Sequence, residues 1–215
     1  MSVVNRKIKT TLRLFPYLKN KELGEKIMID DDSIHYISIR EYAEKITDII
    51  KIHIKTLDID NNEVMITDMM AGCGGDTISF AKNFKHVYAI EIDKTRCEYL
   101  HNNISVYEHT NVTVLNNDCL NIVTQISDHT VVYIDPPWGG PNYKTFDNLR
   151  LCISQEPVEN ICNIVMDQTI MRKIPRLIVL KLPKNYDLAF FYKKITHKNI
   201  YYYDLKKMII LVIVV

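Results

Sequence analysis

Three acidic side chains stand where three expected strands end, and a glycine-rich turn follows the first of them. The segment DMMAGCGGD contains Asp68 and this turn, while Glu91 and Asp118 follow in AIEID and LNNDCL. Glycines let a backbone come close to a ligand, and a helix N-terminus behind such a turn favours a carboxylate. An acid ending the second strand can accept both hydroxyls of a ribose, and Asp118 can accept an adenine amino hydrogen. These residues predict a site for a ligand that contains adenosine. Enzymes that bind NAD use the same kinds of residue, but their glycine turn has the spacing G-x-G-x-x-G, which this segment lacks.

Taken together, the turn and the three acids resemble the cofactor site of the class I methyltransferases. The resemblance implies S-adenosylmethionine as the cofactor, S-adenosylhomocysteine as the product, and no metal. The cofactor contacts it implies are Asp68, Ala71, Gly72, Gly74, Thr77, Glu91, Asp118 and Asp135, and Phe15 joins them through the resemblance of the segment RLFPYL described below.

A second group of residues suits methyl transfer to an amine attached to a ring. Asp135-Pro136-Pro137-Trp138 has the form [DNS]-P-P-[YFW] that amino-group methyltransferases carry. Such an amine is flat, so acceptors such as the Asp135 carboxylate and the Pro136 carbonyl must hold it while it becomes tetrahedral. The aromatic residue supplies a stacking platform worth about 1–3 kcal/mol. We therefore predict Asp135, Pro136 and Trp138 as catalytic residues, and the motif alone leaves adenine, cytosine, glutamine and guanine amines open.

The longer segment DPPWGGPNY, residues 135–143, closely resembles the W-G-G-P-x-Y block of the trimethylguanosine synthase family, the cap-specific guanine-N2 methyltransferases. The resemblance implies methylation of the exocyclic N2 amine of an N7-methylguanosine RNA cap, to the 2,7-dimethyl or the 2,2,7-trimethyl form. Tryptophan suits this substrate because N7-methylguanine is cationic and indole is the best face for a cation. Two alternatives remain open: a DNA or RNA adenine-N6 methyltransferase, and a cap-binding module without catalysis.

Other segments extend the resemblance along the chain. RLFPYL resembles the family's R-L-F-S-R-F arm, AGCGGDTISFA its glycine turn, and LKLPKN its F-L-P-R-N block, with Lys184 in place of an arginine. Arg6 and Lys184 are then expected on the cap phosphates, and Asn103 on the face of the base opposite Trp138. The substrate contacts implied are Arg6, Tyr36, Asn103, Trp138, Pro141, Tyr143 and Lys184.

The elements that must position these residues alternate along the chain. Apolar runs predict strands at residues 63–70, 86–93, 112–118, 130–135 and 176–182. Helical spacing of apolar residues predicts helices at 38–54, 76–84, 94–109, 119–126, 160–171 and 187–195. Residues 198–215 are predicted to form a terminal hairpin. Ser38 and Glu41 suggest a capping box at the start of the first helix. We expect an α/β class I (Rossmann-like) methyltransferase fold: a mostly parallel seven-stranded sheet ending in an antiparallel hairpin. A small N-terminal helical arm, residues 1–60, would precede the methyltransferase domain, residues 61–215.

Composition excludes several other classes. A net charge of +1 argues against broad binding along nucleic acid, and the five cysteines lack a C-x-x-C pair. The scattered histidines have no metal-ligand spacing. The longest apolar run, residues 208–215, is far shorter than the roughly 20 residues of a membrane span. We expect a monomeric protein in a reducing intracellular compartment, nucleus or cytoplasm, whose Lys, Ile and Asn usage is compatible with a viral origin.

Overall fold

The computed structural model describes residues 13–18 and 20–215. The strands form a seven-stranded sheet in the order β3-β2-β1-β4-β7-β9-β8, with antiparallel pairing at the β9 and β8 end, so the predicted fold class is confirmed. The chain divides into two compact units, one ending at Asn117 and the other running from Asp118 to Val215. The expected boundary at residue 60 stays a prediction.

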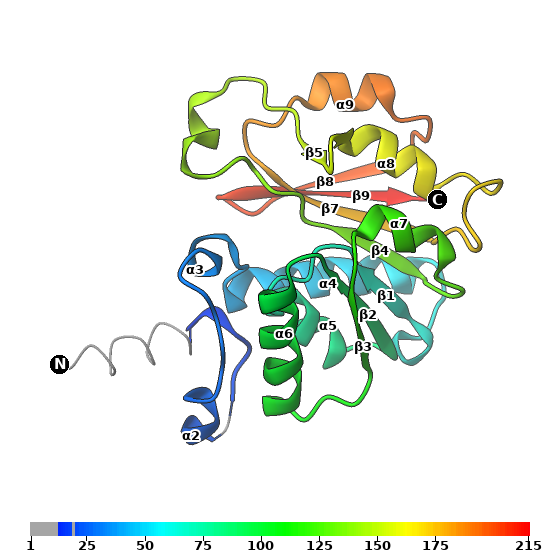
Figure 1. Cartoon of the computed structure of the whole chain (residues 1–215). Helices are drawn as coiled ribbons and strands as arrows, with labels where there is room; N and C mark the ends of the chain where they lie inside the picture. The colour runs from blue at the N-terminus through cyan, green and yellow to red at the C-terminus, as the bar shows by residue number, and fades with distance from the viewer. Residues whose placement is uncertain (1–12, 19) are drawn as a thin grey trace. The chain divides into compact units, whose positions relative to one another are not determined.

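The first unit contains three parallel strands with helices between them (Figure 1). Its elements are α2 (Lys21–Gly24), α3 (Ser33–Tyr36), α4 (Arg40–Thr56), η1 (Asn61–Glu63), β1 (Met65–Asp68), α5 (Gly75–Ala81), β2 (His86–Glu91), α6 (Lys94–Val106) and β3 (Val112–Asn116). Helix α4 packs against α5, and α6 packs against β2 and β3. Strands β1, β2 and β3 are neighbours and run parallel, so their carboxyl ends lie side by side. Predicted site residues stand at these ends or directly after them.

The predicted capping box at the start of α4 is wrong. The N-cap is Ile39 rather than Ser38, and the Ile39 side chain makes no capping hydrogen bond. Ser38 instead donates its hydroxyl to Asp76 Oδ2 at 2.6 Å, a buried hydrogen bond to the first turn of α5. This hydrogen bond satisfies one oxygen of a buried carboxylate, which would be costly to leave without a donor.

The second unit contains the remaining strands of the sheet together with short helices, of which α8 and α9 lie side by side (Figure 1). Its elements are α7 (Cys119–Ile122), η2 (Val123–Gln125), β4 (Val131–Ile134), η3 (Pro141–Thr145), β5 (Cys152–Ile153), β6 (Glu156–Pro157), α8 (Val158–Val165), β7 (Leu177–Pro183), α9 (Leu188–Lys194), β8 (Ile200–Asp204) and β9 (Met208–Val214). Strand β7 runs parallel to β4 and antiparallel to β9, and β8 and β9 form the expected hairpin.

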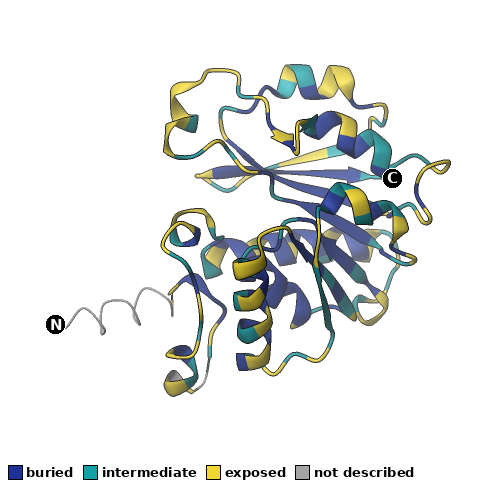
Figure 2. Ribbon diagram, in the orientation of Figure 1, coloured by how far each residue is buried: buried dark blue, intermediate teal, exposed yellow. Residues whose placement is uncertain are grey.

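Burial explains why the strands were readable as apolar runs. Every residue of β4 and β7 is buried, as are six of the seven residues of β9, whereas β8 is largely exposed (Figure 2). Strands covered on both faces read as continuous apolar segments rather than alternating ones. The short β5–β6 hairpin was not expected, and α8 begins and ends earlier than the predicted 160–171.

Candidate active site

The glycine-rich turn joins β1 to α5, and two of its glycines have backbone angles that other residues rarely adopt. Gly72 has φ +53°, and Gly74, the N-cap of α5, has φ +99°. A Cβ built on Gly74 would lie 2.7 Å from Leu100 Cδ1, whereas a Cβ on Gly72 would meet no atom of the described residues within 4 Å. A side chain at Gly74 would therefore have to displace the end of the buried Leu100, and Gly72 borders space in which a ligand can approach the backbone.

Glu91, at the end of β2, lies directly beside this turn. Its Oε2 accepts a hydrogen bond from the Gly72 N–H at 2.8 Å, and its Oε1 accepts one from the Asp93 N–H at 2.8 Å. The two bonds fix the orientation of a carboxylate that is only 7% exposed. Each carboxylate oxygen can accept two hydrogen bonds, so Glu91 retains acceptor capacity for a ligand.

Asp68, the residue that ends β1, is buried and is held by the first turn of the following helix. Its Oδ2 accepts a hydrogen bond from Thr77 Oγ1 at 2.6 Å. The Ala71 N–H donates to the Ile90 carbonyl of β2 at 2.9 Å, which fastens the turn to the neighbouring strand. The structure thus brings the predicted cofactor residues of the first unit around one turn.

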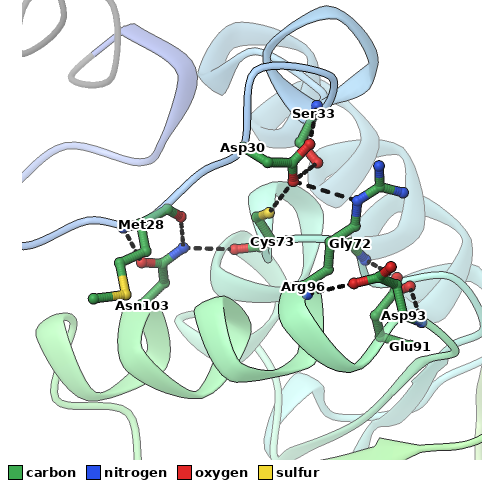
Figure 3. A network of polar contacts seen from close by, with 9 residues as sticks. All are labelled: Met28, Asp30, Ser33, Gly72, Cys73, Glu91, Asp93, Arg96 and Asn103. Atoms are coloured by element: carbon green, nitrogen blue, oxygen red, sulfur yellow. Dashed lines mark hydrogen bonds and ion pairs between the residues drawn. The ribbon is translucent and has the colours of Figure 1, made fainter.

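Asn103, on α6, ties the N-terminal segment to the glycine turn (Figure 3). Its Nδ2 donates to the carbonyls of Met28 (2.8 Å) and Cys73 (2.9 Å), and its Oδ1 accepts from the Met28 N–H at 2.8 Å. The side chain has no exposed surface. These bonds give Asn103 a structural task, and its expected contact with a base stays a prediction.

Asp30 makes a second tie, which the sequence analysis missed (Figure 3). Its carboxylate accepts hydrogen bonds from the Ser33 N–H (2.8 Å), the Ser33 hydroxyl (2.5 Å) and Arg96 Nε (3.3 Å), and lies 3.7 Å from Cys73 Sγ. Partial burial acts to raise the pKa of Asp30, but the hydrogen bonds from Ser33 and Arg96 outweigh it and lower this pKa to about 2. The D-x-x-S spacing was the available signal, because an Asp often accepts from backbone a few residues ahead.

Three predicted contacts lie in or near the N-terminal arm. Phe15 is fully buried in a hydrophobic cluster that also contains Ile29, Cys73 and Ile78. Tyr36, the last residue of α3, is 55% exposed. Arg6 lies outside the described residues.

In the second unit, Asp135 follows β4 and is paired with a lysine that the sequence analysis did not single out. Lys181 Nζ, on β7, lies 2.6 Å from Asp135 Oδ2. The Lys181 side chain is 3% exposed and the Asp135 side chain 20% exposed. Pro136 is buried behind Asp135. The carboxylate expected to hold an amine is therefore itself held by a buried ammonium.

Trp138 stands three residues beyond Asp135 and is partly exposed. The rings of Trp138 and Tyr143 meet edge to face, with ring centroids 5.1 Å apart and planes at 69°, and Lys181 Nζ lies 5.8 Å from the Trp138 ring centroid. Pro141 opens the short helix η3 that carries Tyr143. Asn185 Nδ2 fastens this loop by donating to the Tyr143 carbonyl at 2.7 Å.

Two further predicted residues of this unit are engaged in other contacts. Asp118 caps α7 by accepting from the Leu120 N–H at 2.9 Å, and it also accepts from Ser154 Oγ at 2.7 Å. Lys184 forms an exposed ion pair with Asp204. An exposed pair of this kind contributes little to stability, so phosphate could replace Asp204 at small cost.

Within residues 13–18 and 20–215, the structure contains neither a metal-binding cluster nor a membrane-spanning helix. No group of three or more His, Cys, Asp or Glu side chains there could hold a metal ion. No helix in that part of the chain has the length and apolar character needed to cross a membrane. Four of the five cysteines are buried, and burial raises the pKa of the Cys73 thiol to about 11.

Comparison with protein families places most of the chain in one match. A model of the RNA cap guanine-N2 methyltransferases matches residues 63–211. An uncharacterised protein of Acanthamoeba polyphaga mimivirus is 36% identical over 218 residues, covering 93% of this chain and 83% of the viral protein. The trimethylguanosine synthase of Schizosaccharomyces pombe is 36% identical over 85 residues, covering 37% of this chain and 35% of the yeast protein.

Among solved structures, a Thermus thermophilus 16S rRNA guanine-N2 methyltransferase in complex with AdoMet and guanosine is similar, with a TM-score of 0.59. The alignment covers 87% of this chain and 43% of the bacterial one, at 12% sequence identity. The TM-score shows a similar fold, and at this sequence identity the similarity shows the fold alone.

Proposed function

The chain belongs to the RNA cap guanine-N2 methyltransferase family, and from that membership we propose that it methylates the exocyclic N2 amine of an N7-methylguanosine cap, using S-adenosylmethionine. The product is the 2,7-dimethyl or the 2,2,7-trimethyl form of the cap.

The first unit supplies the residues that fit the cofactor. Gly72 borders open space, and the buried carboxylate of Glu91 is fixed beside it by two backbone N–H groups. These features suit a ligand that brings a ribose and approaches the backbone closely. Asp68 and Thr77 hold the turn in shape, and Phe15 packs behind Cys73. S-adenosylmethionine, when bound, supplies the electrophilic methyl group.

The second unit supplies the residues that fit the amine. The Asp135 carboxylate and the Pro136 carbonyl would accept the two amine hydrogens, which orients the nitrogen and favours positive charge on it during transfer. Trp138 would stack on the base. The attraction between an indole face and a cation favours the N7-methylated purine over the unmethylated one.

Trp138 is the observation on which the substrate assignment depends. It is the only tryptophan of the chain, it is partly exposed, and its ring lies within reach of the carboxylate and lysine pair at the end of β4. Its indole N–H is buried and has no hydrogen-bond partner among the described residues. Tryptophan N–H groups usually find a partner when buried, so a ligand acceptor would complete this site.

The contacts assigned to the cap phosphates are Arg6 and Lys184, and Tyr36 and Pro141 would line the base. Of these residues, Lys184 is a cation whose contacts the structure describes. It forms an exposed ion pair with Asp204, and a cap phosphate could take the place of the Asp204 carboxylate at small cost. We place the reaction inside cells, where capped RNA occurs, in the nucleus or the cytoplasm, and expect a monomer. The viral relative supports a viral origin.

The test is methyl transfer to a minimal cap, followed by mass spectrometry. The protein is incubated with S-adenosylmethionine and either N7-methyl-GDP or unmodified GDP. We expect one or two methyl groups on N7-methyl-GDP and at least about tenfold less transfer to GDP, since the cation contributes much of the stacking. Equal transfer to both would overturn the assigned role of the N7 methyl.

The matched variants are Trp138→Ala and Trp138→Phe. Alanine removes the platform, so turnover should fall by at least about tenfold. Phenylalanine keeps a weaker aromatic face, so the turnover of Trp138→Phe should lie between those of the wild type and Trp138→Ala. Transfer to an adenine-containing substrate in place of N7-methyl-GDP would identify the adenine-N6 alternative. Tight binding of N7-methyl-GDP without transfer would identify a cap-binding module.

A further inference from the structure

Lys181 is a charged residue in a strand that is otherwise apolar. Strand β7 has the sequence LIVLKLP and every one of its residues is buried. Lysine is almost never fully buried unless it is paired, because removing an ammonium from water is costly. The sequence and the burial therefore point to a specific task for Lys181.

The contacts of Lys181 join the two side chains to which we assign the amine and the base. Its ammonium lies 2.6 Å from Asp135 Oδ2 and 5.8 Å from the centroid of the Trp138 ring. All three residues belong to the second unit. A buried ammonium over an indole ring is an attractive contact in its own right, so Lys181 fixes the ring as well as the carboxylate.

We propose that Lys181 is a positioning residue of the methyl-transfer site: it orients the Asp135 carboxylate toward the amine and covers one face of Trp138, so that the base stacks on the other face. This proposal rests on the proposed function. It adds an assignment that the motif DPPW does not contain, because Lys181 comes from a strand 46 positions further along the chain.

The pairing also defines what Asp135 contributes. The ammonium balances the charge of the carboxylate, so Asp135 acts as an oriented hydrogen-bond acceptor rather than as an unpaired negative charge beside the base. Attraction of a cationic purine then depends on Trp138 rather than on Asp135. Lys181 and Asp135 consequently act together, and removing one of them changes the electrostatic environment of the other.

A double-mutant cycle tests this dependence. Lys181→Met removes the ammonium that lies 2.6 Å from the carboxylate, and it should lower kcat by at least about tenfold, with a smaller change in KM. Asp135→Ser removes the carboxylate and keeps the positive charge near the amine, so it should also lower kcat. Combining Asp135→Ser with Lys181→Met removes both charges, and we expect about fivefold or more recovery of kcat relative to Asp135→Ser alone. Lys181→Arg, which keeps the charge, should retain more activity than Lys181→Met.

The same cycle on Lys173 and Asp128 is the control. This pair has a similar distance, 2.7 Å, but its side chains are 53% and 43% exposed. Lys173→Met and Asp128→Ser should leave kcat unchanged, singly and together. Thermal melting of every variant, and quenching of the single tryptophan by N7-methyl-GDP, separate loss of folding and of binding from loss of turnover.

The outcomes distinguish the two proposals. A wild-type protein that methylates no cap analogue overturns the proposed function and this inference with it. A wild-type protein that methylates N7-methyl-GDP, while Lys181→Met lowers kcat by the same factor with and without Asp135→Ser, overturns this inference alone. Opposite effects of Lys181→Met in the two backgrounds support it.

Discussion

Replacing Gly74 by alanine adds a methyl group at a position where the structure has no room for it. The new Cβ would lie 2.7 Å from Leu100 Cδ1 and 3.4 Å from Ile78 Cδ1, and Leu100 is fully buried. Gly72→Ala, two residues earlier, is the matched control, because its Cβ would meet no atom of the described residues within 4 Å. Both positions have positive φ, but the φ of +53° at Gly72 lies in the left-handed region that other residues can enter, whereas the φ of +99° at Gly74 lies outside it, so Gly74→Ala carries more backbone strain as well as the overpacking.

The expected free energies follow from these two contributions. A residue with a Cβ in the left-handed region costs about 1–2 kcal/mol, and alanine recovers about 0.4–1 kcal/mol by restricting the unfolded chain. Gly72→Ala should therefore lower the free energy of unfolding by about 1 kcal/mol or less. Overpacking adds about 1–3 kcal/mol at Gly74, which gives a total loss of about 2–4 kcal/mol.

Urea denaturation gives the free energies of unfolding, and calorimetry with S-adenosylmethionine gives the affinities. Gly72→Ala should stay folded yet bind the cofactor about tenfold more weakly or worse, since its methyl group enters the open space beside Glu91. Equal losses of stability at the two positions would refute the packing argument. Wild-type cofactor affinity in Gly72→Ala would refute the assignment of that space to the cofactor.

Two other predictions concern stability. Asp30→Asn should lower the free energy of unfolding at neutral pH by about 1–2 kcal/mol, a value discounted for partial exposure from the drop in its pKa from 3.8 to about 2. Because the pKa of Asp30 is lower in the folded than in the unfolded protein, its ionised carboxylate stabilises the fold at pH values above the unfolded pKa. Urea denaturation should therefore show that the stability difference between wild type and Asp30→Asn shrinks as the pH falls from about 4 toward 2. Tyr186→Phe removes the hydroxyl that donates to buried Glu159 Oε1 at 2.6 Å, and should cost about 1–3 kcal/mol in the same assay. Glu159→Gln keeps an acceptor without the charge, so a loss larger than that of Tyr186→Phe would contradict this account.

The elements that sequence patterns predicted well are those whose burial is continuous. Strands β4, β7 and β9 are buried on both faces and read as apolar runs. The end of α8 was predicted too late, because Asp167 accepts from the Thr169 N–H at 2.8 Å and offers the backbone an alternative to another helical turn. The β5–β6 turn has positive φ at Ser154 and Gln155, without the glycine or asparagine that normally signals such a turn.

In the candidate site, the sequence identified residues at strand ends but not the distant side chains that pair with them. Residues at strand ends, such as Glu91 and Asp135, were identifiable because the strands themselves were. Their partners were not, since the ion pair of Asp135 with Lys181 joins two strands far apart in the sequence. Asp30 and Arg96 are likewise 66 positions apart. A pattern in one sequence identifies which residue ends a strand, but it carries no information about which distant side chain will balance its charge.

The position of β9 affects the order in which the second unit can fold. Strand β9 lies between β7 and β8, although both of these precede it in the chain. Strand β7 is a run of apolar residues, and its partner on that side is supplied by Met208–Val214, which follow it in the chain. Strand β8 pairs locally with β9, so the two can dock on β7 as a finished hairpin. Until that pairing forms, the backbone groups along this side of β7 are unpaired and can pair with the strand of another chain.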